Sequence, residues 1–468
     1  MKVKNILFGI LMCTAYLAYS QNTTPTHILF KKDSVGNIAK TITRAYGNNS
    51  ISYMEIDGKH YFSYASYMQT VPEDSVLLNS VEISADYTVN DFKVVDSSHI
   101  YCCGKYTEGI DNYGFIAFFN ISDFITNNTI NFKVMNNFQS YDEDVSDLTK
   151  IETFFLSNKL HTIAIGTTSN SKACILEIVG TKGATSVTYK VGSSSASEKF
   201  NDIAVTDNYV VTVGSISSPD ATIRRFPKQS IFSNAANNSL AYTYPTNESN
   251  PTMYLAENTD DFLIAPVVND IVAIASYWYY PPLANLGNDL QGTLMRIYNI
   301  AQTTAPVMMS SISINQLYYS GNWKLKELQY NNSLQMFTLL QDMELPSTQQ
   351  LSSVISTLDF VNNPNITQFK YLSGIELRSL DNITNSIYNI ISGYAVANST
   401  NYFILIGDKV NNQSLPCGYD TYSTNSFKTT YENKDINMDI AVFTSPFNCT
   451  HIKFTNNYSI RMIYSCGL

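Results

Sequence analysis

Charged side chains are scarce in this chain: Asp, Glu, Lys and Arg make up 15 % of its 468 residues, against roughly a quarter in an average soluble domain. Basic residues are the scarcer sign, with 29 Lys and Arg against 39 Asp and Glu. This leaves no basic surface to neutralise phosphates, so nucleic acid is not an expected partner. Hydrophobic residues, in contrast, reach 44 %, with 33 Tyr and 24 Phe. That content excludes a disordered chain and predicts a folded core.

Long apolar runs are missing except at the N-terminus. Residues 1–20 place two lysines before an apolar stretch, and Ala18-Tyr19-Ser20 follows it. This pattern is typical of a secretory signal peptide that is cleaved after Ser20. The alternative, a membrane anchor, is disfavoured because the apolar stretch is shorter than the roughly 20 residues that span a bilayer. We therefore expect a secreted, periplasmic or cell-surface protein with no transmembrane segment after signal removal.

Cysteine is sparse as well, and it lacks the spacing of a metal site. No C-x-x-C motif occurs, and the five His do not pair at ligand spacing, which disfavours zinc. An exported chain can oxidise its cysteines, but six of them allow 15 pairings. The six that remain after signal removal are Cys102, Cys103, Cys174, Cys417, Cys449 and Cys466.

The chain contains an internal repeat. Asn90–Asp96 reads N-D-F-K-V-V-D and runs on to Gly104, while Asn201–Asp207 reads N-D-I-A-V-T-D and runs on to Gly214. Apolar residues alternate in both copies, as in half-buried strands. The Asp207-Asn208 pair suits a tight hairpin turn with positive φ.

Weaker copies follow the same design, with two apolar arms around a short polar turn. Segments 114–122 and 292–300 also match each other and predict the third strand of a repeat. A spacing of roughly 40 to 60 residues between turns is typical of propeller blades. The turn centres fall near positions 58, 97, 158, 208, 270, 332 and 383.

These motifs resemble the repeats of exported bacterial β-propellers of the LVIVD and YVTN type. The resemblance implies an all-β protein with four-stranded antiparallel blades. Seven blades are preferred, and six or eight remain open. We expect residues 21–468 to form one propeller domain after the signal peptide at 1–20. Families of this kind are mostly binding or scaffold proteins, and the resemblance implies no catalytic residue.

An aromatic segment is the first candidate site. Tyr277, Trp278, Tyr279 and Tyr280 are adjacent and precede two prolines. Strand alternation cannot bury four neighbouring aromatics on one side, so some of them are expected to be exposed. Exposed Tyr and Trp suit sugar stacking or contact with a protein partner. The competing interpretation is packing between neighbouring blades.

Carboxylates supply two further candidates. Asp142, Asp144 and Asp147 lie in an acidic segment that could supply oxygen ligands to Ca²⁺, although a solvated loop is the favoured interpretation and no other cofactor is expected. Asp91 and Asp202 occupy matched positions in the repeat. We interpret this pair as structural acceptors of backbone N–H groups, because a catalytic site needs only one copy.

The C-terminal region, 417–468, is predicted to form a hairpin that helps to close the ring. Two strand-like arms flank Asn456–Ser459, and a four-residue loop brings Cys449 opposite Cys466 for a disulfide. A second register frees Cys466 for Cys417. Residues 27–31 are expected to add a strand against this last sheet.

Two functions stay open. The first is an exported, non-enzymatic binding or scaffold protein that presents propeller loops to a glycan or a protein partner. The alternative is a carbohydrate-active enzyme, a lyase or hydrolase, with its site at the channel mouth. Fold alone does not decide between them, because propellers host both.

Overall fold

The computed structural model is almost entirely β-strand, as expected. Among its described residues, α2 (Ile121–Asn127) and a short 3-10 turn, η1 (Lys228–Ser230), are the helical elements. None of the described helices is long and apolar enough to cross a membrane. The structure describes residues 27–30, 37–47, 49–66, 77–140, 143–184, 186–194, 198–216, 220–232, 240–244, 262–280, 290–301, 307–317, 324–345, 350–359, 365–371, 375–383, 388–397, 400–409, 420–421, 425–427, 434–436, 440–455 and 458–463.

Most strands belong to up-and-down antiparallel units of four, which we number in chain order. Units 1 to 3 are β2 (Ile38–Tyr46), β3 (Asn49–Ile56), β4 (Lys59–Ser66) and β5 (Leu77–Ile83); β6 (Tyr87–Val95), β7 (His99–Glu108), β8 (Asp111–Asn120) and β9 (Thr129–Asn136); and β11 (Glu143–Leu156), β12 (Lys159–Thr168), β13 (Ala173–Gly180) and β14 (Ser186–Ser194), with the short β10 (Gln139–Ser140) beside β11.

Units 4 to 6 are β15 (Glu198–Val205), β16 (Tyr209–Ile216), β17 (Asp220–Pro227) and β18 (Leu240–Tyr244); β19 (Phe262–Pro266), β20 (Ile271–Tyr280), β21 (Leu290–Asn299) and β22 (Val307–Leu317); and β23 (Lys324–Asn331), β24 (Met336–Leu345), β25 (Gln350–Asp359) and β26 (Asn365–Tyr371). Unit 7 combines β27 (Ile375–Asn382), β28 (Tyr388–Ala397) and β29 (Thr400–Lys409) with the N-terminal β1 (His27–Phe30). Segments 114–122 and 292–300 supply β8 and β21, the third strands of their units, as predicted.

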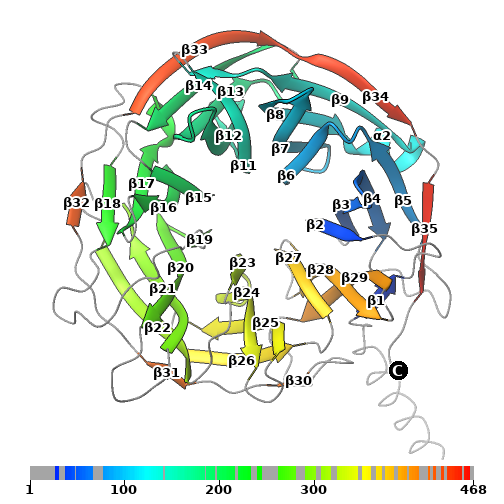
Figure 1. The fold of residues 1–468 in the computed structure, drawn as a ribbon. Helices are drawn as coiled ribbons and strands as arrows, with labels where there is room; N and C mark the ends of the chain where they lie inside the picture. The colour runs from blue at the N-terminus through cyan, green and yellow to red at the C-terminus, as the bar shows by residue number, and fades with distance from the viewer. Residues whose placement is uncertain are drawn as a thin grey trace, which may run out of the picture.

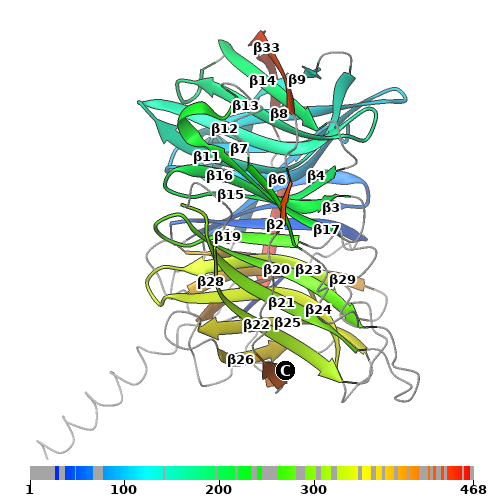
Figure 2. The same cartoon turned by 90° about the vertical axis from the view of Figure 1, so that its left-hand side faces the viewer.

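The units are arranged in a ring with the first strand of each at the centre (Figure 1). Each innermost strand contacts the innermost strand of the next unit, and β27 of unit 7 contacts β2 of unit 1. Seen edge-on, the strands run across the thickness of the ring (Figure 2). This arrangement fits a β-propeller. We call the side on which the innermost strands begin the leading face, and the side on which they end the trailing face.

The hydrophobic core lies between neighbouring units. One cluster joins units 1 and 2 around Phe62, Phe92 and Phe132, and another joins units 2 and 3 around Phe118 and Phe138. Similar clusters lie between units 3 and 4, 4 and 5, 5 and 6, and 7 and 1. Both faces of the sheets in units 1 to 5 are therefore buried, which explains why many of their strands are apolar at consecutive positions.

A β-bulge recurs in the innermost strands, and it explains the glycine that ends the repeat motif. In β6 the pairing with β7 shifts between Val89 and Asp91, beside Gly104. A Cβ on Gly104 would lie less than 3.0 Å from the backbone oxygen of Thr88, so only glycine fits. Gly166, Gly214 and Gly393 are blocked in the same way by the backbone of β11, β15 and β27. The bulge bends the strand locally and re-aims the residues beside it.

The C-terminal segment adds a fifth, outermost strand to six units in reverse order. We call residues 420–463 the belt. Its strands pair with units 6, 5, 4, 3, 2 and 1 in turn, along the outside of the ring (Figure 1). They are β30 (Asp420–Thr421), β31 (Asn425–Phe427), β32 (Lys434–Ile436), β33 (Ile440–Asn448), β34 (Thr450–Thr455) and β35 (Tyr458–Ile463).

The predicted C-terminal hairpin is therefore wrong. The two arms do not pair with each other, because each meets the open edge of a different unit: β34 pairs with β9, and β35 pairs with β5. The register argument for a Cys449–Cys466 disulfide is lost with it. Cys449 is a free thiol in the structure, while Cys466 and Cys417 lie outside the described residues.

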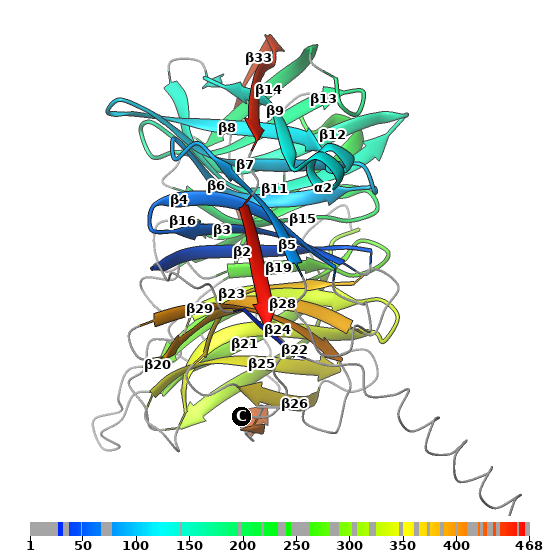
Figure 3. The ribbon, with the colours of Figure 1, turned by 90° about the vertical axis from the view of Figure 1, so that its right-hand side faces the viewer.

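The predicted strand at residues 27–31 does form, as β1, and it takes part in ring closure. It pairs with β29 on one edge and with β35 on the other. Units 1 and 7 thereby become one nine-stranded sheet. Figure 3 shows the red β35 crossing from the blue strands of unit 1 toward the orange strands of unit 7.

Two expectations about turns need correction. Asp57-Gly58 joins the second and third strands of unit 1, whereas the other predicted turns join first and second strands. Asp207 and Asn208 are not among the residues with positive φ. Their turn is held instead by Asp270 of unit 5, which accepts hydrogen bonds from the Asn208 backbone and side chain.

Candidate functional site: the centre and the leading face of the ring

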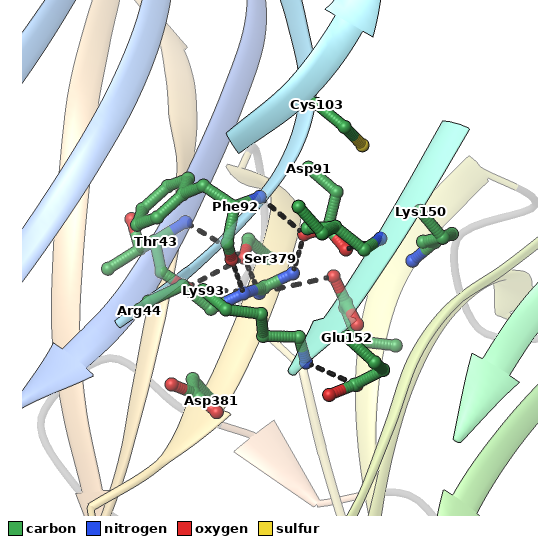
Figure 4. A network of polar contacts seen from close by, with 12 residues as sticks. Thr43, Arg44, Asp91, Phe92, Lys93, Cys103, Lys150, Glu152, Ser379 and Asp381 are labelled. Carbon is green, nitrogen blue, oxygen red and sulfur yellow. Dashed lines mark hydrogen bonds and ion pairs between the residues drawn. The ribbon is translucent and has the colours of Figure 1, made fainter. Parts of the chain in front are cut away.

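Charged side chains gather where the innermost strands meet, although the chain has few of them. Figure 4 shows this central network, in which side chains from units 1, 2, 3 and 7 converge. Ion pairs extend it to units 4 and 6. Its charged members are Arg44, Asp91, Lys93, Lys150, Glu152, Asp202, Glu327 and Asp381.

Arg44 on β2 is the most highly connected member. Its Nη2 lies 2.6 Å from Asp91 Oδ1, and its Nη1 lies 3.5 Å from Glu327 Oε1. The guanidinium also donates to the Phe92 carbonyl and to Ser379 Oγ. The side chains of Arg44 and Asp91 are only 5 % and 4 % exposed. Burial opposes ionisation of Asp91, but Arg44 with Lys150 and Lys93 outweighs it and holds its pKa below the usual value.

The other two ion pairs are more open. Lys93 Nζ lies 2.7 Å from Glu152 Oε1, and Lys150 Nζ lies 3.8 Å from Asp202 Oδ1. Burial raises the pKa of Asp202 to about 6, against the opposing charge of Lys150. Burial also raises the pKa of Glu152 despite the neighbouring Lys93. These two carboxylates keep their protons to higher pH than ordinary ones.

Three central carboxylates connect neighbouring units through backbone N–H groups. Asp91 Oδ2 accepts from Ile151 N at 3.2 Å, and Asp202 Oδ2 accepts from Ile264 N at 2.9 Å. The structural interpretation of this repeated Asp is confirmed, and the backbone donor belongs to the next innermost strand. Asp381 does the same across the closure point, where its Oδ2 accepts from Ala45 N at 2.8 Å.

Ser379 takes the place of the repeated Asp in unit 7. It follows the bulge of β27, as Asp91 follows the bulge of β6. Its Oγ accepts from Thr43 N at 3.0 Å and donates to the Thr43 carbonyl. The three cations of the central network form ion pairs with four of its five carboxylates, and Asp91, Asp202 and Asp381 tie consecutive units together through backbone hydrogen bonds, which is a structural task.

A second polar cluster, on the leading face of unit 7, is more accessible. We call Glu376, Arg378 and Tyr394 the leading-face trio. Arg378 Nη2 lies 2.5 Å from Glu376 Oε1 and 3.0 Å from the Tyr394 hydroxyl, which in turn hydrogen-bonds Glu376 Oε2. The Arg378 and Glu376 side chains are 31 % and 35 % exposed.

The trio departs from the pattern set by other bulge residues. Asn90 and Lys326 occupy the bulges of β6 and β23, and each donates to a carbonyl of the next unit, Leu148 or Leu377. Arg378 occupies the bulge of β27 but binds within its own unit. Burial, with a contribution from Glu376, raises the pKa of Tyr394, so its phenol stays neutral and acts as a hydrogen-bonding group.

The aromatic segment lies on the same face as the trio. It forms the end of β20, and Ser276 pairs with Phe262 at the start of β19. Tyr277 is half-buried and packs against the core between units 5 and 6. The side chains of Trp278, Tyr279 and Tyr280 lie outside the described residues, so their exposure stays a prediction.

The acidic segment also lies on the leading face, at the start of β11. Its described members, Asp144 and Asp147, already form contacts within the protein. Asp147 Oδ1 accepts from Asn90 Nδ2 at 2.6 Å, and burial raises the pKa of Asp147. Asp144 pairs in register with Gln139, and Asp142 lies outside the described residues. Within the part of the chain that is described, no group of three His, Cys, Asp or Glu could hold a metal ion. Calcium binding stays a prediction.

Three cysteines are buried where sequence reasoning had allowed disulfides. Cys102, Cys103 and Cys174 are free thiols packed between sheets. Burial raises the pKa of Cys102 and Cys103 far above the usual range and that of Cys174 to about 12. A thiol that resists ionisation is a poor nucleophile, so these residues act as small apolar side chains.

Comparison with known proteins adds little. No family model matches the chain, and no curated protein matches it. Among solved structures, a subtype N10 neuraminidase-like protein of A/little yellow-shouldered bat/Guatemala/060/2010 is similar over 70 % of this chain and 96 % of its own, with 10 % identity and a TM-score of 0.37. A TM-score this low carries no argument about the site. The resemblance to LVIVD and YVTN repeats stays a prediction that no matched family supports.

Sequence reasoning missed Arg44, Asp381 and the leading-face trio. Arg44 interrupts an otherwise uncharged run, Thr41-Ile42-Thr43 before it and Ala45 after it, and an isolated charge in a predicted inner strand is a usable signal. Asp381 lies two residues after Ser379, which holds the position of Asp91 and Asp202, so the repeat gave no signal for it. The trio had no local signal, because Tyr394 is 16 residues from Arg378 in sequence.

Proposed function

We propose that this chain is an exported β-propeller of seven blades that binds a glycan on its leading face. The seven four-stranded units support this blade number, as does the cycle of contacts between innermost strands from β2 to β27 and back. Export rests on the signal-peptide pattern of residues 1–20, which lie outside the described residues.

The observation that carries the binding proposal is the leading-face trio. Arg378, Glu376 and Tyr394 present planar, partly exposed groups that can donate to and accept from vicinal hydroxyls. Tyr277 to Tyr280, two units away around the ring, end a strand on the same face. Aromatic rings that stack on the C–H faces of sugars, with a few placed polar groups, are the usual composition of a sugar site.

A binding role is favoured over catalysis because of the state of the central carboxylates. Asp91 is paired with Arg44 and bonded to backbone N–H groups, and Asp202 and Asp381 also accept backbone hydrogen bonds. A glycosidase needs one carboxyl group free to donate a proton and a second free to attack or to activate water.

The carbohydrate-active alternative is supported by the direct contact between Glu376 and Tyr394 and by the raised pKa of Asp202 and Glu152, because a raised carboxyl pKa suits a general acid. The raised pKa of Tyr394 argues against its use as a nucleophile, because the phenolate is the reactive form. We therefore place the enzyme second.

The test is a glycan array with the mature protein, followed by affinity measurements on any glycan that binds. Trp278→Ala and Arg378→Ala are expected to weaken binding by about tenfold or more, the equivalent of losing about one good contact. Phe155→Ala is the matched control, since Phe155 is 54 % exposed at the end of β11 on the trailing face.

Two outcomes contradict the proposal. If Phe155→Ala weakens binding as much as Trp278→Ala does, the leading face is not the binding surface. If incubation with the bound glycan yields a cleaved product that Tyr394→Phe abolishes, the protein is an enzyme.

A further inference from the structure

A buried polar cluster of unit 6 lies beside the leading-face trio. It consists of Lys326 on β23, Asp342 on β24 and Ser353 on β25, and we call these three residues the unit 6 clamp. Lys326 Nζ and Ser353 Oγ each donate to Asp342 Oδ1 at 2.6 Å. The Lys326 and Asp342 side chains are only 5 % and 6 % exposed, and Ser353 is buried. The clamp is therefore a fixed interior cluster, unlike a solvated pair on the surface.

The unit 6 clamp reaches across to unit 7 and holds both backbone polar groups of Leu377. The Leu377 N–H donates to Ser353 Oγ at 2.9 Å, and the Leu377 carbonyl accepts from Lys326 Nζ. Glu376 precedes Leu377, and Arg378 follows it in the β-bulge of β27. Each planar peptide group of Leu377 includes the Cα atom of one of these neighbours. The clamp thus sets the positions from which Glu376 and Arg378 extend.

The polar groups of the unit 6 clamp are fully used. The Lys326 ammonium has three N–H donors, and its acceptors are Asp342, Ser353 Oγ and the Leu377 carbonyl. The Ser353 hydroxyl gives its one proton to Asp342, the nearest acceptor, and accepts from Lys326 and from the Leu377 N–H. Removal of one member leaves the others without a buried partner, so the backbone at Leu377 must move.

The unit 6 clamp does not recur at the corresponding positions of other units. On the second strand of a unit, one residue lies just beyond the β-bulge of the first strand and pairs with a residue of the third strand. In unit 6 this pair is Asp342 and Ser353, a carboxylate and a hydroxyl. The pairs in units 2, 3, 4 and 7 are Lys105 with Gly114, Thr167 with Ala173, Ser215 with Ala221, and Tyr394 with Phe403.

This contrast separates the clamp from the ties that hold the ring together. The tie made by Asp91 and Asp202 recurs because consecutive units need the same connection. The clamp, in contrast, lies beside the leading-face trio and is not repeated in the other units compared. A task tied to one place on the ring explains this distribution better than a general role in ring stability.

We propose that the unit 6 clamp positions the leading-face trio: by fixing the Leu377 backbone, it holds Glu376 and Arg378 in the orientation that binds a glycan. The clamp residues are positioning residues, because they are too buried to meet a ligand and act through Leu377. Lys326 Nζ also lies 3.9 Å from Glu376 Oε1 and attracts this carboxylate directly. The effect on glycan affinity rests on the proposed function, whereas the positioning itself does not.

Arginine side-chain NMR of the full chain tests the positioning without a glycan. The Nε–H signal of Arg378 is assigned with Arg378→Lys, and it is expected to shift in Ser353→Ala and in Asp342→Asn. Ser356→Ala is the matched control. Ser356 is buried on the same strand as Ser353, and its Oγ has no hydrogen-bond partner among the described residues. This control is expected to leave the Arg378 signal unchanged.

Affinity for a glycan found on the array tests the consequence for binding. Ser353→Ala and Asp342→Asn are each expected to weaken binding at least about fivefold, at a temperature at which both variants are folded. Ser353→Thr keeps the hydroxyl and is expected to recover most of the affinity lost in Ser353→Ala. Ser356→Ala is expected to bind as the wild type does. Should Ser353→Ala fail to fold, Asp342→Asn, which keeps the shape of the side chain, gives the same comparison.

Two results overturn the proposal. One is a lowered unfolding temperature of Ser353→Ala and Asp342→Asn with an unchanged Arg378 signal, which means that the clamp only stabilises the ring. The other is unchanged affinity of both variants for a glycan that Arg378→Ala no longer binds. Failure of the proposed function looks different: the wild type then binds no glycan, which overturns the glycan site, and the Arg378 signal still decides whether the clamp positions the trio.

Discussion

The inner and outer edges of the ring are held by different kinds of interaction. At the inner edge, buried side chains pair their charges and accept backbone N–H groups, as Asp91 does with Arg44 and Ile151. At the outer edge, a backbone ladder from the belt covers the last strands, and the described apolar belt side chains, Cys449, Ile452 and Phe454, are only partly buried. At the inner edge, individual side chains determine which groups pair. At the outer edge, the register of backbone hydrogen bonds mainly determines the pairing.

This difference has an energetic consequence. A buried charge that loses its partner leaves the other charge unpaired in a low-dielectric interior, which is costly. A lost edge strand exposes backbone groups to water, which can hydrogen-bond them. Substitutions at the centre are therefore expected to destabilise the whole ring, whereas substitutions in the belt act locally.

The largest effect is expected from Asp91→Ala. The change leaves the buried Arg44 without its 2.6 Å partner and removes the acceptor for Ile151 N. The free energy of unfolding in urea is expected to fall by about 3–5 kcal/mol, as for other broken buried pairs. The double variant Arg44→Met/Asp91→Leu removes both charges and is expected to recover part of the loss. If the double variant is less stable than Asp91→Ala, the charge argument fails.

The second-largest loss of stability is expected at the β-bulge of β15, which sets the direction of the Asp202 side chain. Gly214→Ala places a Cβ less than 3.0 Å from the backbone oxygen of Lys199, so the bulge of β15 must shift. We expect a loss of about 1–3 kcal/mol in the free energy of unfolding, the usual cost of forcing extra atoms into a packed site. Ser215→Ala on the same strand is the control and is expected to cost less than about 0.5 kcal/mol. Equal stability of the two variants would contradict the role assigned to the glycine.

The contributions of Asp202 and Asp91 to the free energy of unfolding are expected to change with pH in opposite directions. Burial raises the pKa of Asp202 from 3.8 to about 6 in the folded state, so folding is favoured when this group is protonated. Its contribution is present below pH 4 and is lost as the pH rises from 4 to 6. The pKa of Asp91 is lowered, and its contribution is lost as the pH falls.

The urea midpoint of Asp202→Asn is therefore expected to decline less than that of the wild type between pH 4 and 6. Asparagine keeps an oxygen that can accept from Ile264 N, so the fold is retained. Asp111→Asn, at an exposed position on the leading face, is the control. Identical pH profiles for wild type and Asp202→Asn would show that the raised pKa is not coupled to folding.

The smallest effect is expected at the surface of unit 1. Lys59 and Glu82 form an ion pair at 3.5 Å, and the Lys59 side chain is 59 % exposed. Exposed pairs typically contribute about 0–1 kcal/mol and weaken with salt. Glu82→Gln is expected to change the free energy of unfolding by less than about 0.5 kcal/mol. A change as large as that of Asp91→Ala would remove the distinction between buried and exposed pairs.

The sequence by itself determined the all-β class, the internal repeat and the Asp and Gly residues that recur within the repeat. Alternating apolar residues around short turns predicted an antiparallel all-β chain, because the period of a strand is visible over five or six residues. The repeat was visible in the sequence because several units share the same β-bulge and need the same residues around it. The matched pairs are Asp91 with Asp202 and Gly104 with Gly214. Their acceptor role followed from the need to satisfy buried backbone donors.

Only the tertiary structure decided which segments meet. The hairpin assigned to the C-terminus was locally reasonable, since both arms have strand-like sequences, but an open edge attracts any strand that reaches it. β34 and β35 pair with the distant strands β9 and β5 and not with each other. The contacts between Arg44 and Asp91, Asp381 and Ala45, and Arg378 and Tyr394 depend in the same way on ring closure or strand register. Pairing between distant segments is set by the geometry of the closed ring, which no local pattern encodes.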